Sequence, residues 1–149
     1  MEGNFINNYA KGVTALGGAV TNSGTIGTID GVFINNSVNG SSAARAGAIY
    51  ISTTRYENGD LVNDDIPEVP LIKGIFIGNH ADSYSSAYGG AISNSTAKGI
   101  MPDIHADFIG NYTVSSHSAR GGAIDALTGL NTVTGNFIGN YAKSLSGNA

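Results

Sequence analysis

The chain of 149 residues contains no cysteine and no tryptophan, only three prolines, and few charged residues. The lack of cysteine excludes disulfides, thiolate catalysis and Cys-ligated metals. Seven basic and 11 acidic residues give a net charge of −4. Because no basic run accompanies this balance, it argues against nucleic acid and against an anionic membrane surface as partners. No apolar run approaches the roughly 18 residues of a membrane-spanning helix, so we expect no direct membrane insertion.

The sequence has instead a repeat made of two alternating motifs. The first is Phe-Ile-x-Asn, with Phe at positions 5, 33, 76, 108 and 137 and Asn three residues later. The second is Gly-Gly-Ala-Ile or a close variant, with its second Gly at positions 18, 47, 90 and 122. The Phe positions are separated by 28, 43, 32 and 29 residues. A period of this size indicates a repeat architecture.

The residues before each Phe alternate as they do in a β-strand. Four residues before each Phe except Phe5 the chain has Ile or Val, two before it has Gly or Ala, and the residue between them is polar. Apolar or small residues at every second position are typical of a strand with one buried face. No apolar pattern at helical spacing runs longer than one or two turns, so the repeat predicts strands without helices.

A repeat of about 29 residues with short strands predicts an all-β fold, a single-stranded parallel β-helix of about four to five coils. We expect three short strands in each coil and one domain over residues 1–149. Coils about 4.8 Å apart place equivalent residues above one another. We therefore expect two structural ladders along the axis. They consist of Phe5, Phe33, Phe76, Phe108 and Phe137, and of Asn8, Asn36, Asn79, Asn111 and Asn140.

The Gly motif predicts a tight corner in every coil, since glycine adopts a positive φ freely and lets backbones approach closely. The corner residues are Gly17, Gly18, Gly47, Gly89, Gly90, Gly121 and Gly122. Ala46 replaces the first Gly in the second copy. We therefore expect that this position does not require a positive φ.

The step of 43 residues contains an acidic segment, which we interpret as a loop insertion at about residues 56–70. Solenoid insertions occur in loops on one face, often the binding face. Asp60, Asp64 and Asp65 could contribute to a calcium site, but the spacing of known calcium loops is absent, and a solvated loop is the simpler interpretation. We expect residues 57–70 to be dispensable for folding.

Two groups of residues have the chemistry of an active site. Asp103, His105 and Asp107 share one strand face and could bind a metal or act as acid and base. Because the residues between them must face the core, an exposed polar face on a convex surface is the simpler interpretation. His117, Ser118 and Asp125 have the composition of a hydrolase triad. No nucleophile-elbow pattern surrounds any serine, and Asp125 occupies a repeat position that we expect to be exposed. We therefore predict no catalytic residues, no metal and no cofactor.

Tyrosine and arginine recur at two other repeat positions and form the predicted binding surface, because both are favoured in recognition. The alternative is that the tyrosines simply pack at coil corners. The residues of this surface are Tyr9, Tyr112, Tyr141, Arg45, Tyr88 and Arg120.

The interleaved Phe-Ile-x-Asn and Gly-Gly-Ala-Ile motifs resemble the repeats of chlamydial polymorphic outer membrane proteins and related autotransporter passengers. The resemblance spans nearly the whole chain and implies a right-handed β-helix at the bacterial cell surface or secreted, used for adhesion to host cells. This chain departs from the family pattern in lacking the barrel, the export signal and any cysteine, and we expect it to be a fragment of a longer solenoid.

The motifs and the resemblance together favour a non-enzymatic adhesin or structural stalk that binds a host or cell-surface protein or glycan. The alternative is a carbohydrate-binding or carbohydrate-degrading protein, since pectate-lyase-like enzymes have a similar fold. An ice-binding solenoid would need a regular threonine array, which is absent. Because a solenoid coil is satisfied only by neighbours on both sides, we also expect end-to-end self-association.

Overall fold

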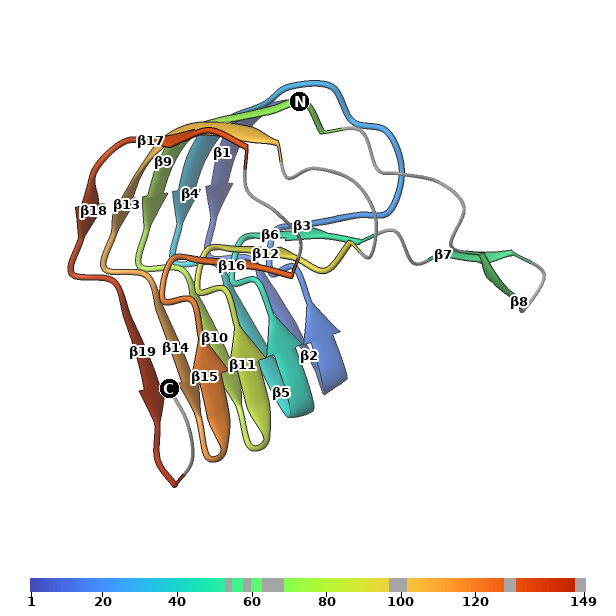
Figure 1. Cartoon of the computed structure of the whole chain (residues 1–149), viewed down its shortest axis with the longest axis vertical. Helices are drawn as coiled ribbons and strands as arrows, with labels where there is room; N and C mark the ends of the chain where they lie inside the picture. Colours follow the sequence, from blue (N-terminus) through green and yellow to red (C-terminus); the bar gives the residue numbers. More distant parts are fainter. Residues whose placement is uncertain (53–54, 58–59, 63–68, 97–101, 128–130, 147–149) are drawn as a thin grey trace.

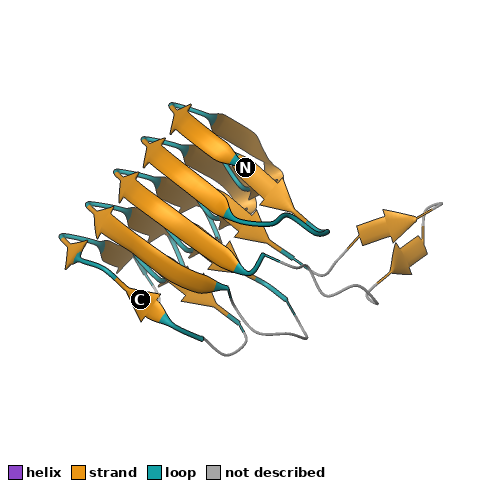
Figure 2. Cartoon of the chain, turned by 90° about the horizontal axis from the view of Figure 1, so that it is seen from above, coloured by secondary structure: helices purple, strands orange, loops and turns teal. Residues whose placement is uncertain are grey.

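The computed structural model describes residues 1–52, 55–57, 60–62, 69–96, 102–127 and 131–146. Its strands stack into a solenoid of about four turns, with three parallel sheets running along the stack (Figures 1 and 2). The described residues contain no helix, and therefore none that is long and apolar enough to cross a membrane. The predicted all-β parallel solenoid is confirmed.

The strands of the three sheets follow one another in the same order in each coil. The first sheet contains β1 (Glu2–Ile6), β4 (Ile29–Ile34), β9 (Leu71–Ile77), β13 (Asp103–Ile109), β17 (Val133–Thr134) and β18 (Phe137–Ile138). The second contains β2 (Tyr9–Leu16), β5 (Ser37–Arg45), β10 (His80–Ser83), β11 (Ser86–Tyr88), β14 (Tyr112–Ser115), β15 (Ser118–Arg120) and β19 (Tyr141–Ser144). The third contains β3 (Val20–Asn22), β6 (Ile49–Ile51), β12 (Ile92–Asn94) and β16 (Ile124–Ala126).

The second sheet differs from the expectation of one short strand per coil, because the chain runs out along it, turns and returns. In the third coil the outgoing strand β10 and the returning strand β11 are separated by Tyr84 and Ser85. The resulting arm is thin (Figure 1). Its interior is a small separate cluster whose members are Val38 and the small residues Ala15, Ala44, Ala81 and Ala87. Alanine side chains fill only a narrow space, so the two layers of the arm lie close together.

The first coil is one residue shorter between Phe and Gly than the others, and its strand register shows where. Gly12 of β2 pairs with Gly40 of β5, but Thr14 pairs with Ala43. One residue of the first coil therefore lies opposite two of the second. This irregularity at the tip of the arm absorbs the length difference and keeps both motifs in register.

The main core lies between the first and third sheets and contains the Phe column. Adjacent rings from Phe5 to Phe137 are stacked nearly parallel with centroids 4.6–4.9 Å apart. The rings of Phe33, Phe76 and Phe108 are completely buried. Ile29, Ile72 and Ile104 form a parallel buried row on the same strands.

The Asn ladder lies at the corner between the first and second sheets. The Asn79 side chain accepts hydrogen bonds from the backbone N–H and the side-chain amide of Asn36, and it donates to the Phe33 carbonyl and to Asn111 Oδ1, over 2.9–3.0 Å. Asn36 and Asn111 repeat the pattern, and all three are completely buried. The ladder thus satisfies buried polar groups and holds each coil to the next.

The expectation that Ala46 marks a position without a positive φ is wrong. Its φ is 64°, and Gly17, Gly89 and Gly121 have values of 50–63° at the equivalent position. A left-handed residue reverses the chain before β3, β6, β12 and β16, and Ala46 adopts the same conformation despite the steric cost. The second glycine of the motif is needed for close approach instead, since a Cβ on Gly90 would lie 2.0 Å from the Gly122 carbonyl oxygen of the adjacent coil.

Part of the expected insertion belongs to the solenoid. β7 (Arg55–Glu57) and β8 (Asp60–Val62) form an antiparallel pair that projects from the stack, and residues 63–68 lie outside the described residues (Figure 2). However, Val69 is buried in the main core, and the Pro70 carbonyl accepts a hydrogen bond from Asp103. The expectation that all of residues 57–70 are dispensable is therefore wrong at this end, because Val69 fills core space.

Candidate functional site

The returning layer of the arm ends in a row of side chains that we name the arginine row. Strand register aligns its members along the axis: Leu16, Arg45, Tyr88 and Arg120. The Arg45 guanidinium lies 5.2 Å and the Arg120 guanidinium 4.5 Å from the centre of the Tyr88 ring. Because the two arginines come from the coils on either side of Tyr88, they cover opposite ring faces. Cation–π attraction stabilises this arrangement.

A second row faces the arginine row across the Gly corner, and we name it the corner row. Its members are Thr21, Tyr50, Ser93 and Asp125. The Thr21 hydroxyl donates to the Leu16 carbonyl, which shows that the two rows meet. Tyr50 and Ser93 are buried, and the Asp125 side chain is only 18% exposed.

The expectation that this repeat position is exposed is confirmed for Thr21 but wrong for Tyr50, Ser93 and Asp125. Alternation along β6, β12 and β16 correctly places these side chains opposite the core, because the preceding Ile49 and Ile92 belong to it and Ile124 packs against it. However, the tight corner folds the arginine row back over that outer face. The glycine pair three or four residues earlier was the available signal, since a sharp reversal places the preceding strand beside the outer side of the following one.

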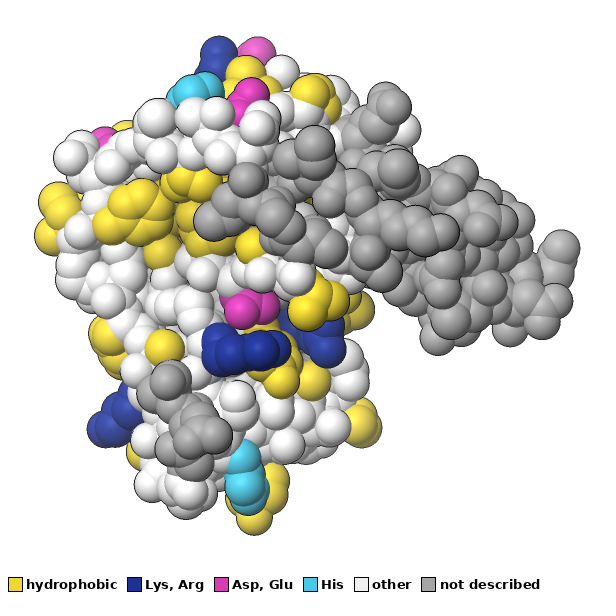
Figure 3. Space-filling model, viewed as in Figure 1, with side chains coloured by type: hydrophobic (Ala, Val, Ile, Leu, Met, Phe, Trp, Pro, Cys, Tyr) yellow, Lys and Arg dark blue, Asp and Glu magenta, His cyan; other side chains and the backbone are white. Residues whose placement is uncertain are grey.

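The arginine row and the corner row together contain more positive than negative charge. Asp125 Oδ1 lies 3.9 Å from Arg120 Nε, and Arg45 donates a 2.8 Å hydrogen bond to the neutral Ser95 hydroxyl. Burial raises the pKa of Asp125 above its usual value, and the charges of Arg120 and Arg45 partly offset this rise. Figure 3 shows basic side chains gathered beside an acidic one in the middle of this face. Two guanidinium groups thus share one largely buried carboxylate.

The other predicted surface positions form an aromatic row on the outgoing layer of the arm. Its members are Tyr9, Ser37, His80, Tyr112 and Tyr141. The His80 and Tyr112 rings are stacked at 4.7 Å, and those of Tyr112 and Tyr141 at 5.1 Å. Both faces of the Tyr112 ring are therefore occupied by neighbours, and mainly its edge is available to a ligand. Tyr9 and Tyr141 at the two ends of the row are 58% and 48% exposed.

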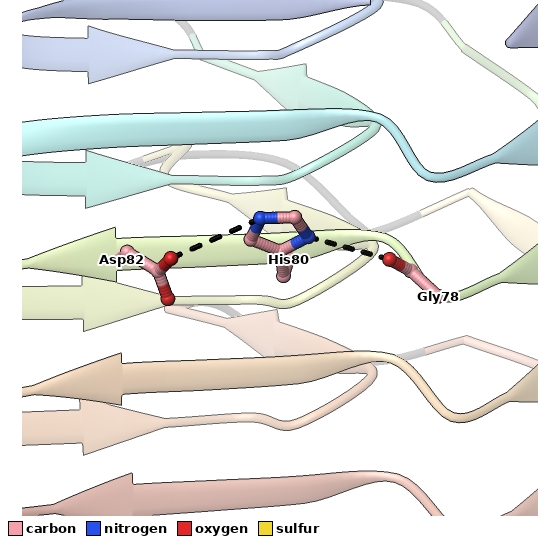
Figure 4. A network of polar contacts seen from close by, with 3 residues as sticks. All are labelled: Gly78, His80 and Asp82. Carbon is pink, nitrogen blue, oxygen red and sulfur yellow. Dashed lines mark hydrogen bonds and ion pairs between the residues drawn. The ribbon is translucent and has the colours of Figure 1, made fainter. Parts of the chain in front are cut away.

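The middle of the aromatic row carries a small polar network (Figure 4). His80 Nδ1 lies 3.4 Å from the Gly78 carbonyl oxygen, and His80 Nε2 lies 3.8 Å from Asp82 Oδ2. Burial raises the pKa of Asp82, while a positive charge on His80 would lower it. The pKa of Tyr112 is also raised, first by burial and then by Asp82 and Tyr141. The network orients His80 within the stack.

Asp103, His105 and Asp107 share a face of β13, as the alternation predicts, but each contacts the next coil. Asp103 accepts from the Asn131 amide and the Thr132 backbone, and Asp107 accepts from the backbone and amide of Asn136. His105 Nδ1 is within hydrogen-bond distance of the Thr134 hydroxyl. These side chains therefore link β13 to the coil after it.

The suspected triad residues have separate partners. His117 contacts the Tyr84 carbonyl and ring, Asp125 pairs with Arg120, and the Ser118 backbone donates to Ser85. Asp64 and Asp65 lie outside the described residues, as does the Asp60 side chain. Within the described part of the chain, no group of three or more His, Asp or Glu side chains is placed to hold a metal ion.

Comparison with known protein families, with curated proteins and with solved structures found no match to this chain.

Proposed function

We propose that the chain is a non-enzymatic β-solenoid module of the bacterial cell surface or of a secreted protein, acting as an adhesin or structural stalk. Its partner is a protein or glycan of a host or of another cell surface. The motif resemblance to autotransporter passengers supports this location and role. The geometry supports it because the polar side chains of β13 contact the following coil.

The observation that carries the proposal concerns β13, the strand whose residues most resemble an active site. Its polar side chains link one coil to the next. Asp103, His105 and Asp107 all direct their polar atoms to residues of the following coil. An acid–base pair or a metal site needs such groups to converge on a space that a substrate can enter. Here Asp103 and Asp107 accept backbone N–H groups of the next coil, and His105 contacts the Thr134 hydroxyl, which suits a rod that has to keep its shape.

The axial ladders provide the rigidity that such a rod needs. The Phe column and the Asn ladder run through every coil from Phe5 and Asn8 to Phe137 and Asn140. Fully satisfied buried amide networks specify a single arrangement, because any slip of register leaves several polar groups unpaired. A surface row on this scaffold therefore keeps a fixed spacing along the axis, which suits display of repeated contacts.

The second function that an observation favours is carbohydrate binding. The arginine row places Arg45, Tyr88 and Arg120 side by side on one face. Arginine and tyrosine suit the recognition of ligands with several hydroxyl and acidic groups. Binding of this kind is compatible with adhesion, whereas carbohydrate degradation requires a catalytic centre in addition.

Beads coated with the intact chain test the proposed function. We expect them to bind host-cell or matrix surfaces more strongly than beads coated with an unrelated protein of equal charge. The same protein, incubated with acidic and neutral polysaccharides, should release no reducing ends or unsaturated products. Equal bead binding would refute adhesion, and sustained polysaccharide cleavage would replace the proposal with the enzymatic alternative.

A further inference from the structure

The arginine row carries an excess of positive charge on a chain whose net charge is −4. Arg120 has a 56% exposed side chain, and its ion pair with Asp125 is long at 3.9 Å. Arg45 is partly buried, and its hydrogen-bond partner Ser95 is uncharged. The one carboxylate in the two rows therefore leaves a positive charge uncompensated. Guanidinium groups bind carboxylates and sulfate-like oxyanions in bidentate geometry.

The order along the row is charged, neutral, charged. Arg45, Tyr88 and Arg120 belong to three consecutive coils, as their strand register shows. Since neighbouring strands are about 4.8 Å apart, the two guanidinium groups repeat at roughly 9.6 Å along the axis. Both faces of the Tyr88 ring are covered, so the edge of the ring with its hydroxyl is what Tyr88 can offer a ligand. The hydroxyl can both donate and accept a hydrogen bond.

This pattern suits one class of linear polymer better than others. In an extended peptide, side chains on one face repeat at about 6.7 or 13 Å, neither of which matches two coils. Nucleic acid carries a charge on every residue and needs many basic contacts, which seven lysines and arginines do not supply. In an extended polysaccharide each sugar ring advances by about the rise of one coil. An acidic group on every second sugar then meets an arginine on every second coil.

We propose that the arginine row binds an acidic polysaccharide lying along the solenoid axis, with acidic groups on alternate sugars contacting Arg45 and Arg120. The uncharged sugar between them contacts the Tyr88 edge and hydroxyl. This inference rests on the proposed adhesive function and names its ligand class. The acidic group is a carboxylate or a sulfate ester, and both share the oxyanion chemistry that guanidinium recognises.

The test measures binding of the intact chain to defined oligosaccharides by calorimetry at low ionic strength. The probes are a hyaluronan oligosaccharide, which has a carboxylate on alternate sugars, a κ-carrageenan oligosaccharide, which has a sulfate ester on alternate sugars and no carboxylate, neutral dextran and poly-glutamate. We expect binding to one or both acidic oligosaccharides, weakened by added salt, and at least tenfold weaker binding to dextran and poly-glutamate. The two acidic probes distinguish carboxylate from sulfate recognition.

The variants distinguish binding by the arginine row from general attraction to positive charge on the chain. Arg45→Gln with Arg120→Gln should reduce affinity at least tenfold. The matched control, Lys11→Gln with Lys143→Gln, removes two charges from exposed positions on the other layer of the arm and should leave affinity within twofold. Asp125→Asn removes the competing carboxylate and should increase affinity severalfold, a gain that misfolding would not produce.

Several outcomes would overturn the inference: equal losses in both double variants, unchanged affinity in the arginine variant, no gain from Asp125→Asn, or equally tight binding of poly-glutamate. The bead assay separates this failure from failure of the proposed function. Beads that adhere to cells while no acidic oligosaccharide binds would leave adhesion intact and remove only this ligand class.

Discussion

Inner and outer coils contain the same residues in the same geometry, but their surroundings differ. The rings of Phe76 and Phe137 belong to one column at nearly constant spacing, yet Phe76 is completely buried and Phe137 is 50% exposed. Likewise Asn79 is completely buried, whereas Asn8 is exposed. The comparison shows that burial in a solenoid comes from having a neighbour on both sides, so the same substitution should have a position-dependent effect.

The largest effect is expected for the Asn ladder. Asn79→Ala removes the acceptor for two Asn36 groups and the donor to the Phe33 carbonyl. Each buried group left unpaired costs about 1–3 kcal/mol, so we expect a total loss of roughly 4–6 kcal/mol. Asn8→Ala removes one hydrogen bond at an exposed position and should cost about 1 kcal/mol. Urea denaturation of both variants measures the difference, and equal midpoints would contradict the ladder's role.

A somewhat smaller effect is expected for the Phe column. Phe76→Ala leaves a cavity between two rings and should destabilise the fold by about 3–5 kcal/mol. Phe5→Ala should cost about 1–2 kcal/mol, because the Phe5 ring is partly exposed and stacks on Phe33 alone. Thermal unfolding of the two variants provides the measurement. Similar melting temperatures would mean that the column does not stabilise the inner coils in the way its geometry indicates.

Exposure of the outer coil also leads to a prediction about association. A hollow at this end is lined by Phe137, Val133, Ile124 and Tyr141 among others. We expect copies of the chain to stack end to end as concentration rises, and Phe137→Lys to reduce the average mass seen by light scattering. Ile109→Lys is the control, since Ile109 is 36% exposed on an inner coil. A mass that stays monomeric, or that falls equally in both variants, would refute end-to-end stacking.

The smallest effect concerns the corner row, where Ser93 has a neighbouring coil on both sides and Asp125 is less covered. Because the native pKa of Asp125 lies above the reference value of 3.8, the folded state binds its proton more tightly than the unfolded state. The stability from the protonated form is present below 3.8 and is lost as pH rises through the native pKa. Asp125→Asn should therefore raise the melting temperature slightly at pH 7 but not at pH 3. A decrease at pH 7 would show that the Arg120 ion pair outweighs burial.

The sequence was sufficient to predict the structure of the coil, because that structure depends on local residue patterns that recur in every repeat. Alternation around Ile104, the Phe spacing and the recurring Asn predicted parallel strands with stacked equivalents, and the structure has them. Positions whose residue differs between the copies of the repeat were harder to predict. The left-handed φ of Ala46 could not be seen in the residue itself, since alanine rarely adopts it and only the three glycines of the other copies indicate it.

The candidate site was only half predictable for a related reason. Arg45, Tyr88 and Arg120 were recognised from their common repeat position, but Asp125 was placed on an open surface. Alternation specifies which side of a strand a residue faces, but not what the rest of the chain places there. Burial of Ser93 and Asp125 depends on the angle at the Gly corner, and burial of Val69 depends on where an irregular segment rejoins the coil.

The ladders have a mechanical consequence for a chain held at both ends. Hydrogen bonds between coils point along the axis, so tension along the axis stretches each of them in its own direction. The outer coil is bound from one side only and should detach first, after which its neighbour becomes the outer coil. Each detachment would release one repeat of 28 to 43 residues as an unfolded segment that lengthens the chain. A stalk of this construction would lengthen in steps under shear and would rewind when the force falls.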